Sequence, residues 1–174
     1  MSGTSGVTVT LWMAMSLNAV VARADQSEDF LSSNDWDLFL ELVRDSDALV
    51  WGRVTHELFI KPVRELFPAL PVAAVTTDPA LLVDDRTVRA GSPEQAIAAL
   101  AERGATTVLL AGGSRINGAF ARAGLIDEVV VAVEPVIVSR GIPLLTGDAP
   151  DLRLDLVAVD DRRRPTLRLH YRVV

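Results

Sequence analysis

The chain has 174 residues, a formal net charge of −6 and 49% hydrophobic side chains, so it can build an apolar core and is expected to fold as one domain. The acidic balance argues against nucleic acid as a partner, because phosphate binding needs a basic surface. There is no cysteine, which excludes disulfides, thiolate metal ligands and a cysteine nucleophile.

The first half of the chain is predicted to alternate between strands and helices. Residues 7–15 first alternate in polarity and then become wholly apolar, as a strand does when it enters the middle of a sheet. Further on, Trp36, Phe39, Leu40 and Val43 recur at the spacing of an amphipathic helix. The expected elements are strands over residues 7–15, 48–51, 72–76 and 87–89, a helix over 35–44, and a helix that begins at Thr55 and is interrupted by Pro62.

The second half continues the alternation and ends in a hairpin. Ser92, the proline after it and Gln95 form a typical helix start, with a hydroxyl cap and a capping-box partner. Two segments of alternating polarity flank the charged turn 160–164 and are predicted to pair as antiparallel strands. The expected elements are helices over 92–103 and 114–123, strands over 107–111 and 129–133, and a hairpin of 152–160 with 166–173.

These elements predict a three-layer α/β/α domain with a mixed, mainly parallel central sheet and a C-terminal antiparallel hairpin. Residues 1–6 lack the basic start of a signal peptide, so we interpret them as a disordered lead before a single domain over residues 7–174. The longest apolar stretch, residues 129–138, contains Glu134 and Pro135 and is far shorter than the roughly 20 residues of a membrane-spanning helix. We therefore expect a cytoplasmic protein without a membrane partner.

Ligands of parallel sheets bind beyond the carboxyl ends of the strands, where this chain has two strand–glycine–helix junctions. At one of them, Gly112 and Gly113 lead directly into a helix whose free N–H groups can attract a phosphate. At the other, Gly52 precedes Arg53, which can bind phosphate with two donors, and Thr55, which can cap the helix or donate to an anion. A tight turn without ligand and a capped helix with a solvated arginine are the structural alternatives. Two such junctions in one small domain favour a dinucleotide.

Two other strand ends are candidates for the substrate side. Ala14, Ser16 and Asn18 are small or short polar residues that can meet a flat ligand, although a plain turn fits them equally well. Glu134 stands at a strand end before a proline, which is an unusual place for a structural carboxylate.

Three other polar residues have simple structural interpretations. Asp35 and Asp37 lie near a helix start, where acidic side chains are favourable without any function. His56 is expected on the surface rather than as a catalytic base.

Several short motifs follow one another in a characteristic order. They are Ala14-Met-Ser-Leu-Asn18, Leu49-Val-Trp-Gly-Arg53-x-Thr55-x-Glu57, Ala111-Gly-Gly-Ser114 with Asn117-Gly118, Leu125-Ile-Asp-Glu128, and Glu134-Pro135 with Gly141-x-Pro143-Leu144. In this order they resemble the reductase domain of the riboflavin-biosynthesis deaminase–reductase, within the dihydrofolate-reductase-like superfamily. The resemblance covers nearly the whole chain and implies the fold of that superfamily.

The resemblance implies an NAD(P)H-dependent reductase that transfers a hydride to a pyrimidine- or pterin-like small molecule, as the reductase of 5-amino-6-ribosylaminouracil phosphate does. NADPH is the expected cofactor, with NADH second, and the expected assembly is a homodimer. Asn18 and Glu134 would face the substrate, with Glu134 as the first candidate for the proton donor and Asp37 as the second. The residues implied in cofactor binding are Ala14, Ser16, Gly52, Arg53, Thr55, Thr76, Thr77, Gly112, Gly113, Ser114, Arg115 and Ile116.

The chain departs from the family pattern at the substrate end, where Asn18 and Ala19 replace an Asp-Gly pair. The absence of cysteine also excludes the usual zinc deaminase motif, so only the reductase half is expected. Because no arginine stands beside Thr76 and Thr77 in the sequence, the preference for NADPH depends on Arg53. The alternatives are a dihydrofolate reductase proper, a non-catalytic nucleotide-binding dimeric protein, and a structural dimerisation domain whose interface is formed by residues 129–138 and the terminal hairpin.

Overall fold

The structure, a computed structural model, describes residues 6–174, so the lead expected over residues 1–6 lies outside the described residues except for Gly6. Its strands are β1 (Thr8–Ser16), β2 (Val20–Ala22), β3 (Ala48–Gly52), β4 (Val72–Val75), β5 (Thr87–Ala90), β6 (Thr107–Leu110), β7 (Glu128–Glu134), β8 (Ile142–Pro143), β9 (Leu154–Asp160) and β10 (Leu167–Val173). Its helices are α1 (Ser33–Arg44), α2 (Arg53–Leu66), α3 (Pro93–Glu102) and α4 (Ser114–Arg122).

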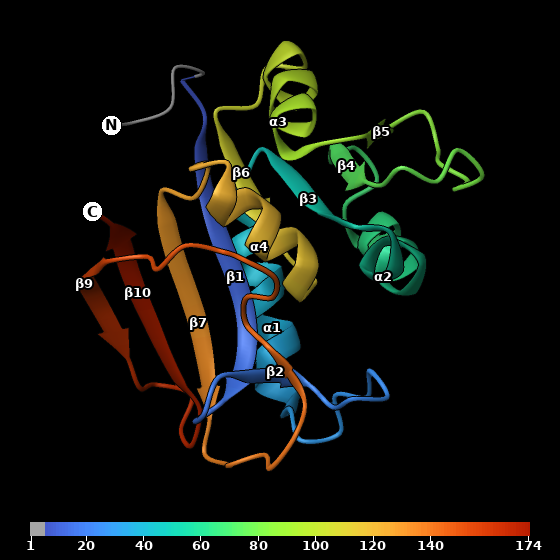
Figure 1. Ribbon diagram of the computed structural model, residues 1–174. Helices are drawn as coiled ribbons and strands as arrows, with labels where there is room; N and C mark the ends of the chain where they lie inside the picture. Colours follow the sequence, from blue (N-terminus) through green and yellow to red (C-terminus); the bar gives the residue numbers. More distant parts are fainter. Residues whose placement is uncertain (1–5) are drawn as a thin grey trace.

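Eight of the strands form one sheet in the order β5-β4-β3-β6-β1-β7-β10-β9 (Figure 1). The strands from β5 to β7 in this order are parallel, whereas β10 pairs antiparallel with both β7 and β9. The short strands β2 and β8 form a separate antiparallel pair. The expected mixed, mainly parallel sheet and the C-terminal hairpin are confirmed.

Helices cover both faces of this sheet. On one face, Val43 of α1 and Val63 of α2 pack with Trp51 of β3 in one hydrophobic cluster. On the other face, Leu100 of α3 and Phe120 of α4 belong to a second cluster. The three-layer α/β/α arrangement predicted from the sequence is therefore confirmed. Within residues 6–174, no helix is long and apolar enough to cross a membrane.

The prediction that Pro62 interrupts its helix is wrong. Helix α2 begins at Arg53, two residues before Thr55, and continues through Pro62 to Leu66. Proline removes one helical hydrogen bond. However, the side chains of Phe59 and Val63 on either side of it pack in the same hydrophobic cluster, and Val63 is fully buried. Because helices in proteins are stabilised mainly by packing of their apolar face, α2 stays continuous.

Candidate active site

The loops expected to bind ligands meet at the carboxyl-terminal edge of the parallel strands. Ser16 at the end of β1 lies opposite Glu134 at the end of β7 in the strand register. The backbone N–H of Gly52 donates a hydrogen bond of 2.8 Å to the carbonyl of Gly112, which joins the loops after β3 and β6. The substrate-side and cofactor-side candidates therefore share one edge of the sheet.

Two helix N-termini come together on the cofactor side. Helix α2 begins after Gly52 and α4 after Gly113, and neither has a side-chain cap, whereas the Ser92 hydroxyl caps α3 by accepting from the Gln95 N–H. A Cβ atom on Gly113 would lie 3.8 Å from Oγ1 of Thr55, so the two first turns adjoin. Unpaired N–H groups of a first helical turn form the usual cradle for a phosphate. This arrangement fits the two phosphates of a dinucleotide.

Close packing at Gly52 and Gly112 requires that both stay without a side chain. A Cβ atom on Gly52 would come 2.7 Å from Cγ1 of Ile116, and one on Gly112 would come 2.8 Å from Sδ of Met13. Gly112 also has a φ of +79°, a conformation that favours glycine. The peptide bond between Gly112 and Gly113 is cis. The side chain of Ile116 thus packs against Gly52, and that of Met13 against Gly112.

The polar side chains around the first turns of α2 and α4 differ in whether they can bind a ligand. Ser114 is buried and its hydroxyl donates to the carbonyl of Pro143, so only its backbone N–H is available for a ligand. Arg53 pairs with Glu57 one turn later at 2.9 Å, and both side chains are partly exposed. Arg115 is exposed and forms no ion pair within residues 6–174. Thr55 lies in the first turn of α2, and its hydroxyl has no hydrogen-bond partner among the described residues, so it can donate to an anion.

The loop after β4 contains Thr76 and Thr77 and has an arginine beside it. The Thr76 hydroxyl accepts a hydrogen bond of 3.0 Å from the N–H of Asp78, and Thr77 is exposed. Arg89 of β5 donates to the carbonyl of Pro79 in the same loop. Arg89 is distant from Thr76 and Thr77 in the sequence, so the sequence does not indicate it. The parallel pairing of β5 with β4 brings it near this loop.

On the substrate side, the side chains of Ser16 and Asn18 are bonded to the protein itself. The Ser16 hydroxyl donates to Oδ1 of Asn18 at 2.8 Å and accepts from the N–H of Val20 at 3.0 Å. The Asn18 amide forms two further hydrogen bonds with the backbone of Val138, of 2.8 and 3.0 Å. Both residues thus hold the turn after β1 against the segment after β7. The buried Ala14 precedes them on β1, and contact of the three with nicotinamide or substrate stays a prediction.

A second carboxyl group lies beside Glu134, and it belongs to Asp35. Oε1 of Glu134 accepts hydrogen bonds of 2.8 Å from the hydroxyls of both Ser32 and Thr166. Asp35 is only 7% exposed, and neither of its carboxyl oxygens has a hydrogen-bond partner among the described residues. Burial, followed by the negative charge of Glu134, raises the pKa of Asp35 to about 7. A carboxyl group with this pKa can hold or release a proton at neutral pH.

Asp37, the second candidate for the proton donor, is not brought to this pair. It is exposed and lies 3.3 Å from Arg163 in an ion pair. Two residues of a helix are separated by roughly 200°, so Asp35 and Asp37 point to different sides of α1. The overlooked signal was that Asp35 shares the helical face of Phe39 and Val43, which the apolar spacing places against the core.

The expectation that His56 lies on the surface is wrong. The residue is 3% exposed, and its Nδ1 accepts a hydrogen bond of 3.0 Å from Nε1 of Trp51. Burial lowers the pKa of His56. Because α2 begins two residues earlier than expected, His56 lies in an ordered turn of the helix against the sheet, where it has a structural role.

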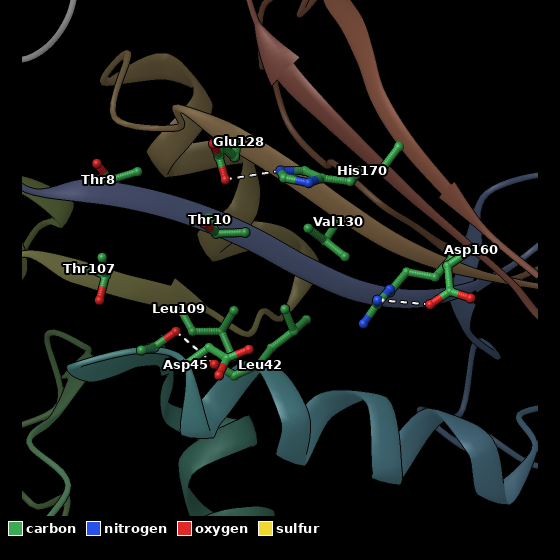
Figure 2. A pocket seen from close by; sticks show the side chains of 13 residues that line it. Thr8, Thr10, Leu42, Asp45, Thr107, Leu109, Glu128, Val130, Asp160 and His170 are labelled. Atoms are coloured by element: carbon green, nitrogen blue, oxygen red, sulfur yellow. Dashed lines mark hydrogen bonds and ion pairs between the residues drawn. The ribbon is translucent and has the colours of Figure 1, made fainter. Parts of the chain in front are cut away.

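A hollow of about 460 Å³ lies at the opposite end of the sheet (Figure 2). It is bordered by Thr8 and Glu128 at the starts of β1 and β7 and by Asp45 at the end of α1. His170 and Glu128 point toward each other in it, with Nε2 and Oε2 3.0 Å apart. None of the residues expected to bind cofactor or substrate borders this hollow, so the chemistry of the carboxyl-terminal edge does not depend on it.

A family model and a sequence relative each match most of the chain. Residues 7–164 match the model of the RibD C-terminal domain. The uncharacterized protein YwjB of Bacillus subtilis (strain 168) is 26% identical over 170 residues, which are 92% of this chain and 95% of that protein.

Solved structures share the fold. A putative riboflavin biosynthesis protein from Shewanella sp. PV-4 has a TM-score of 0.78 at 22% identity, over 97% of this chain and 99% of that one. The diaminohydroxyphosphoribosylaminopyrimidine deaminase/5-amino-6-(5-phosphoribosylamino)uracil reductase of Thermotoga maritima has a TM-score of 0.75 at 17% identity, over 97% of this chain but 57% of that one. These matches confirm the resemblance noted in the sequence, and the chain belongs to the RibD C-terminal domain family.

Proposed function

We propose that the protein is a reductase that transfers a hydride from NADPH to a pyrimidine- or pterin-like small molecule. The observation that carries this proposal is that two uncapped helix N-termini and a buried carboxyl pair share one edge of the sheet. The first provides a cradle for a dinucleotide, and the second provides proton chemistry. Membership of the RibD C-terminal domain family supports the same reaction class.

The cofactor would be held mainly by backbone and by a few side chains. The N–H groups that follow Gly52 and Gly113 would bind the two phosphates, with the hydroxyl of Thr55 and the guanidinium of Arg115 beside them. The bound dinucleotide supplies a hydride to the substrate. Ala14 and Ser16 would border its nicotinamide ring.

The preference for NADPH over NADH would come from arginine. Thr76 and Thr77 would lie near the adenosine ribose, and Arg89 contacts the loop that follows them. Arg53 adds a second guanidinium at the start of α2. A guanidinium favours the additional phosphate of NADPH, because it donates two parallel hydrogen bonds to phosphate oxygens.

Glu134 and Asp35 would act on the substrate. Reduction of a C=N bond requires a proton at nitrogen as well as a hydride at carbon, and a carboxyl group within reach can deliver it. Asn18 would contribute its remaining amide N–H at the border of the same site. Asp37 is not proposed as the donor, because it is exposed and paired with Arg163.

We also propose a homodimer that uses the side of β9 facing away from α1. Leu154, Leu156 and Val159 are 39%, 57% and 56% exposed, and each pairs with an apolar residue of β10 that packs on the α4 side of the sheet. A continuous exposed apolar face of this kind is typical of a protein–protein contact, and a twofold dimer covers it with an identical face. Most residues of β7 are buried inside the sheet, so the hairpin alone would form the interface.

Cofactor binding and turnover test the function separately. Titration of the protein with NADPH, followed by nicotinamide fluorescence, should give saturable binding, and no binding at millimolar cofactor would contradict the proposal. A panel containing 5-amino-6-(5-phosphoribosylamino)uracil and dihydrofolate then distinguishes the two substrate classes. Glu134→Gln should lower turnover and leave NADPH affinity nearly unchanged, whereas Glu128→Gln, at the other end of the same strand, should change neither.

A further inference from the structure

We propose that the Asp35–Glu134 pair holds a single proton at neutral pH, that this proton resides on Asp35, and that Ser32 and Thr166 are positioning residues that keep Glu134 ionised. The location of the proton follows from the burial and the hydrogen bonds of the two carboxyl groups. Its delivery to a substrate rests on the proposed reductase function.

The hydrogen bonds of the two carboxyl groups are asymmetric. Oε1 of Glu134 accepts from two hydroxyls, whereas neither oxygen of Asp35 has a hydrogen-bond partner among the described residues. The nearby backbone N–H of Ser32 lowers the pKa of Asp35 by less than burial and Glu134 raise it. Hydrogen bonds to a carboxylate favour its charged form, and burial without them favours the neutral form. The charge of the pair is therefore stabilised on Glu134.

Because the Ser32 hydroxyl donates to Glu134, helix α1 lacks a side-chain cap. Ser32 stands at the N-cap position of α1, where a serine hydroxyl normally accepts from a helical N–H. Here it makes no cap and donates to Glu134 instead. Thr166, which is 1% exposed, supplies the second donor from the other end of the chain, and the two hydroxyl oxygens lie 3.3 Å apart.

Among the described residues, no ion pair neutralises either carboxyl group of the Asp35–Glu134 pair. Within residues 6–174, no lysine, arginine or histidine forms an ion pair with Asp35 or Glu134. Arg163 precedes Thr166 by three residues but pairs with Asp37 and Glu41.

Glu28 is the other ionisable group that acts on Asp35, and its negative charge also raises the pKa of Asp35. Burial raises the pKa of Glu28 itself. With like charges close together and no cation, two ionised carboxylates are unfavourable, so the pair keeps one proton.

The proton on Asp35 would complete the reduction. The hydride would form a C–H bond at the carbon of a substrate C=N group, while the π electrons of that group form an N–H bond. Because both carboxyl oxygens of Asp35 are buried, its proton would reach the substrate nitrogen through the adjacent Glu134. The C=N bond would become CH–NH, with the hydride supplied by the bound dinucleotide, and Asp35 would be left as a carboxylate that regains a proton from water through Glu134. Before and after this transfer, the ionised Glu134 would accept a hydrogen bond from a substrate N–H and orient the ring.

Carbon-13 NMR of the aspartate and glutamate carboxyl carbons, in the protein without ligands, tests the location of the proton. We expect the Asp35 signal to titrate with a midpoint of about 7. Asp35→Asn should remove the titrating signal, and Asp45→Asn, at the other end of α1, should keep it. A protonation step of Glu134 at neutral pH, with Asp35 ionised, would overturn the proposal.

Removal of the hydroxyl donors tests the positioning residues. In Thr166→Val and in Ser32→Ala, the Glu134 carboxylate loses a donor, so the proton should move toward Glu134 and the midpoint of Asp35 should fall. Thr166→Ser retains a hydroxyl and should restore the wild-type titration. Ser33→Ala is the matched control for Ser32, because Ser33 is exposed and does not contact Glu134. Titrations unchanged by both Thr166→Val and Ser32→Ala would contradict the role of the hydroxyls.

The pH dependence of turnover tests delivery of the proton. With saturating NADPH, kcat should fall as the pH rises through about 7, and Asp35→Asn should lower kcat by about 100-fold and abolish this dependence. NADPH affinity should change by less than about twofold, since the pair makes no part of the phosphate cradle. If Asp35 titrates as expected but no substrate is reduced, the reductase function fails while the location of the proton stands. If reduction occurs and Asp35→Asn retains full kcat, Asp35 is not the donor.

Discussion

The hydroxyl of Ser32 donates a 2.8 Å hydrogen bond to Oε1 of Glu134, a residue 102 positions further along the chain. The contact joins the start of α1 to the end of β7 and brings Asp35 beside Glu134. The residue at the N-cap position of α1 thus makes a long-range contact, which sequence rules for helix caps do not predict.

The raised pKa of Asp35 predicts that folding stability decreases between pH 3.8 and about 7. In this range the folded protein retains a proton that the unfolded chain has released, so the stabilisation is complete below pH 3.8 and is lost as the pH passes about 7. At about 1.4 kcal/mol per pKa unit, the decrease is at most about 4 kcal/mol. Urea unfolding of wild type and Asp35→Asn across this range measures it, because their difference cancels the contributions of His56 and Asp84. A constant difference would contradict the raised pKa.

Ala19 adopts a φ of +59°, a left-handed conformation that costs energy for any residue with a Cβ atom. Ala19→Gly should therefore raise the free energy of unfolding by about 0.5–1 kcal/mol, after allowance for the greater entropy of the unfolded glycine. The reverse change provides the control: Gly104 has a φ of +88° in open space, so Gly104→Ala should destabilise by about 1 kcal/mol. Chemical denaturation measures both changes in stability, and a loss of stability in Ala19→Gly would show that Ala19 is not strained.

Arg53 is expected to select NADPH over NADH. Arg53→Met should weaken NADPH binding by about tenfold and leave NADH binding nearly unchanged, because only the former has the additional phosphate. Glu57→Gln should have the opposite effect on NADPH, since it releases Arg53 from its 2.9 Å ion pair. Fluorescence titration with both cofactors provides the measurement, and Arg153→Met, an exposed arginine before β9, is the control. Equal losses for both cofactors would show that Arg53 does not read that phosphate.

The apolar face of β9 is expected to form the dimer contact. Leu156→Glu should convert the protein to a monomer in sedimentation velocity experiments, because a carboxylate in an apolar twofold contact would be buried beside its own symmetry copy. Leu82→Glu is the matched control, since Leu82 is 89% exposed in the loop between β4 and β5. A wild-type monomer at high concentration would rule out this interface.

The sheet and its helices were predictable because most of their segments are long enough to show periodicity. Strand β7 and helix α1, for example, occur within a few residues of their expected bounds. Strands β2 and β8 were missed because three and two residues show no pattern. Pro62 was misjudged because its helix is stabilised by tertiary packing of Val63, which local sequence rules do not include.

The candidate site was predictable where it depends on backbone conformation and less so where it depends on contacts. Glycines mark junctions in the sequence itself, so the first turns after Gly52 and Gly113 could be identified. The environment of a carboxyl group is set by residues distant in sequence. Asp35 therefore seemed an ordinary helix-start acid, and Glu134 had no visible partner until Thr166 and Ser32 were placed next to it.

The segment that follows β7, residues 135–144, is held by side chains at both of its ends. Asn18 binds the backbone of Val138 near one end of this segment, and Ser114 and Asn117 of α4 bind the carbonyls of Pro143 and Leu144 near the other. The segment is thus bonded at one end to the turn after β1, which would border the substrate, and at the other to the helix that would bind the phosphates. Binding of a phosphate at the first turn of α4 would therefore be transmitted through this segment to the turn after β1, so the two proposed binding regions are mechanically connected.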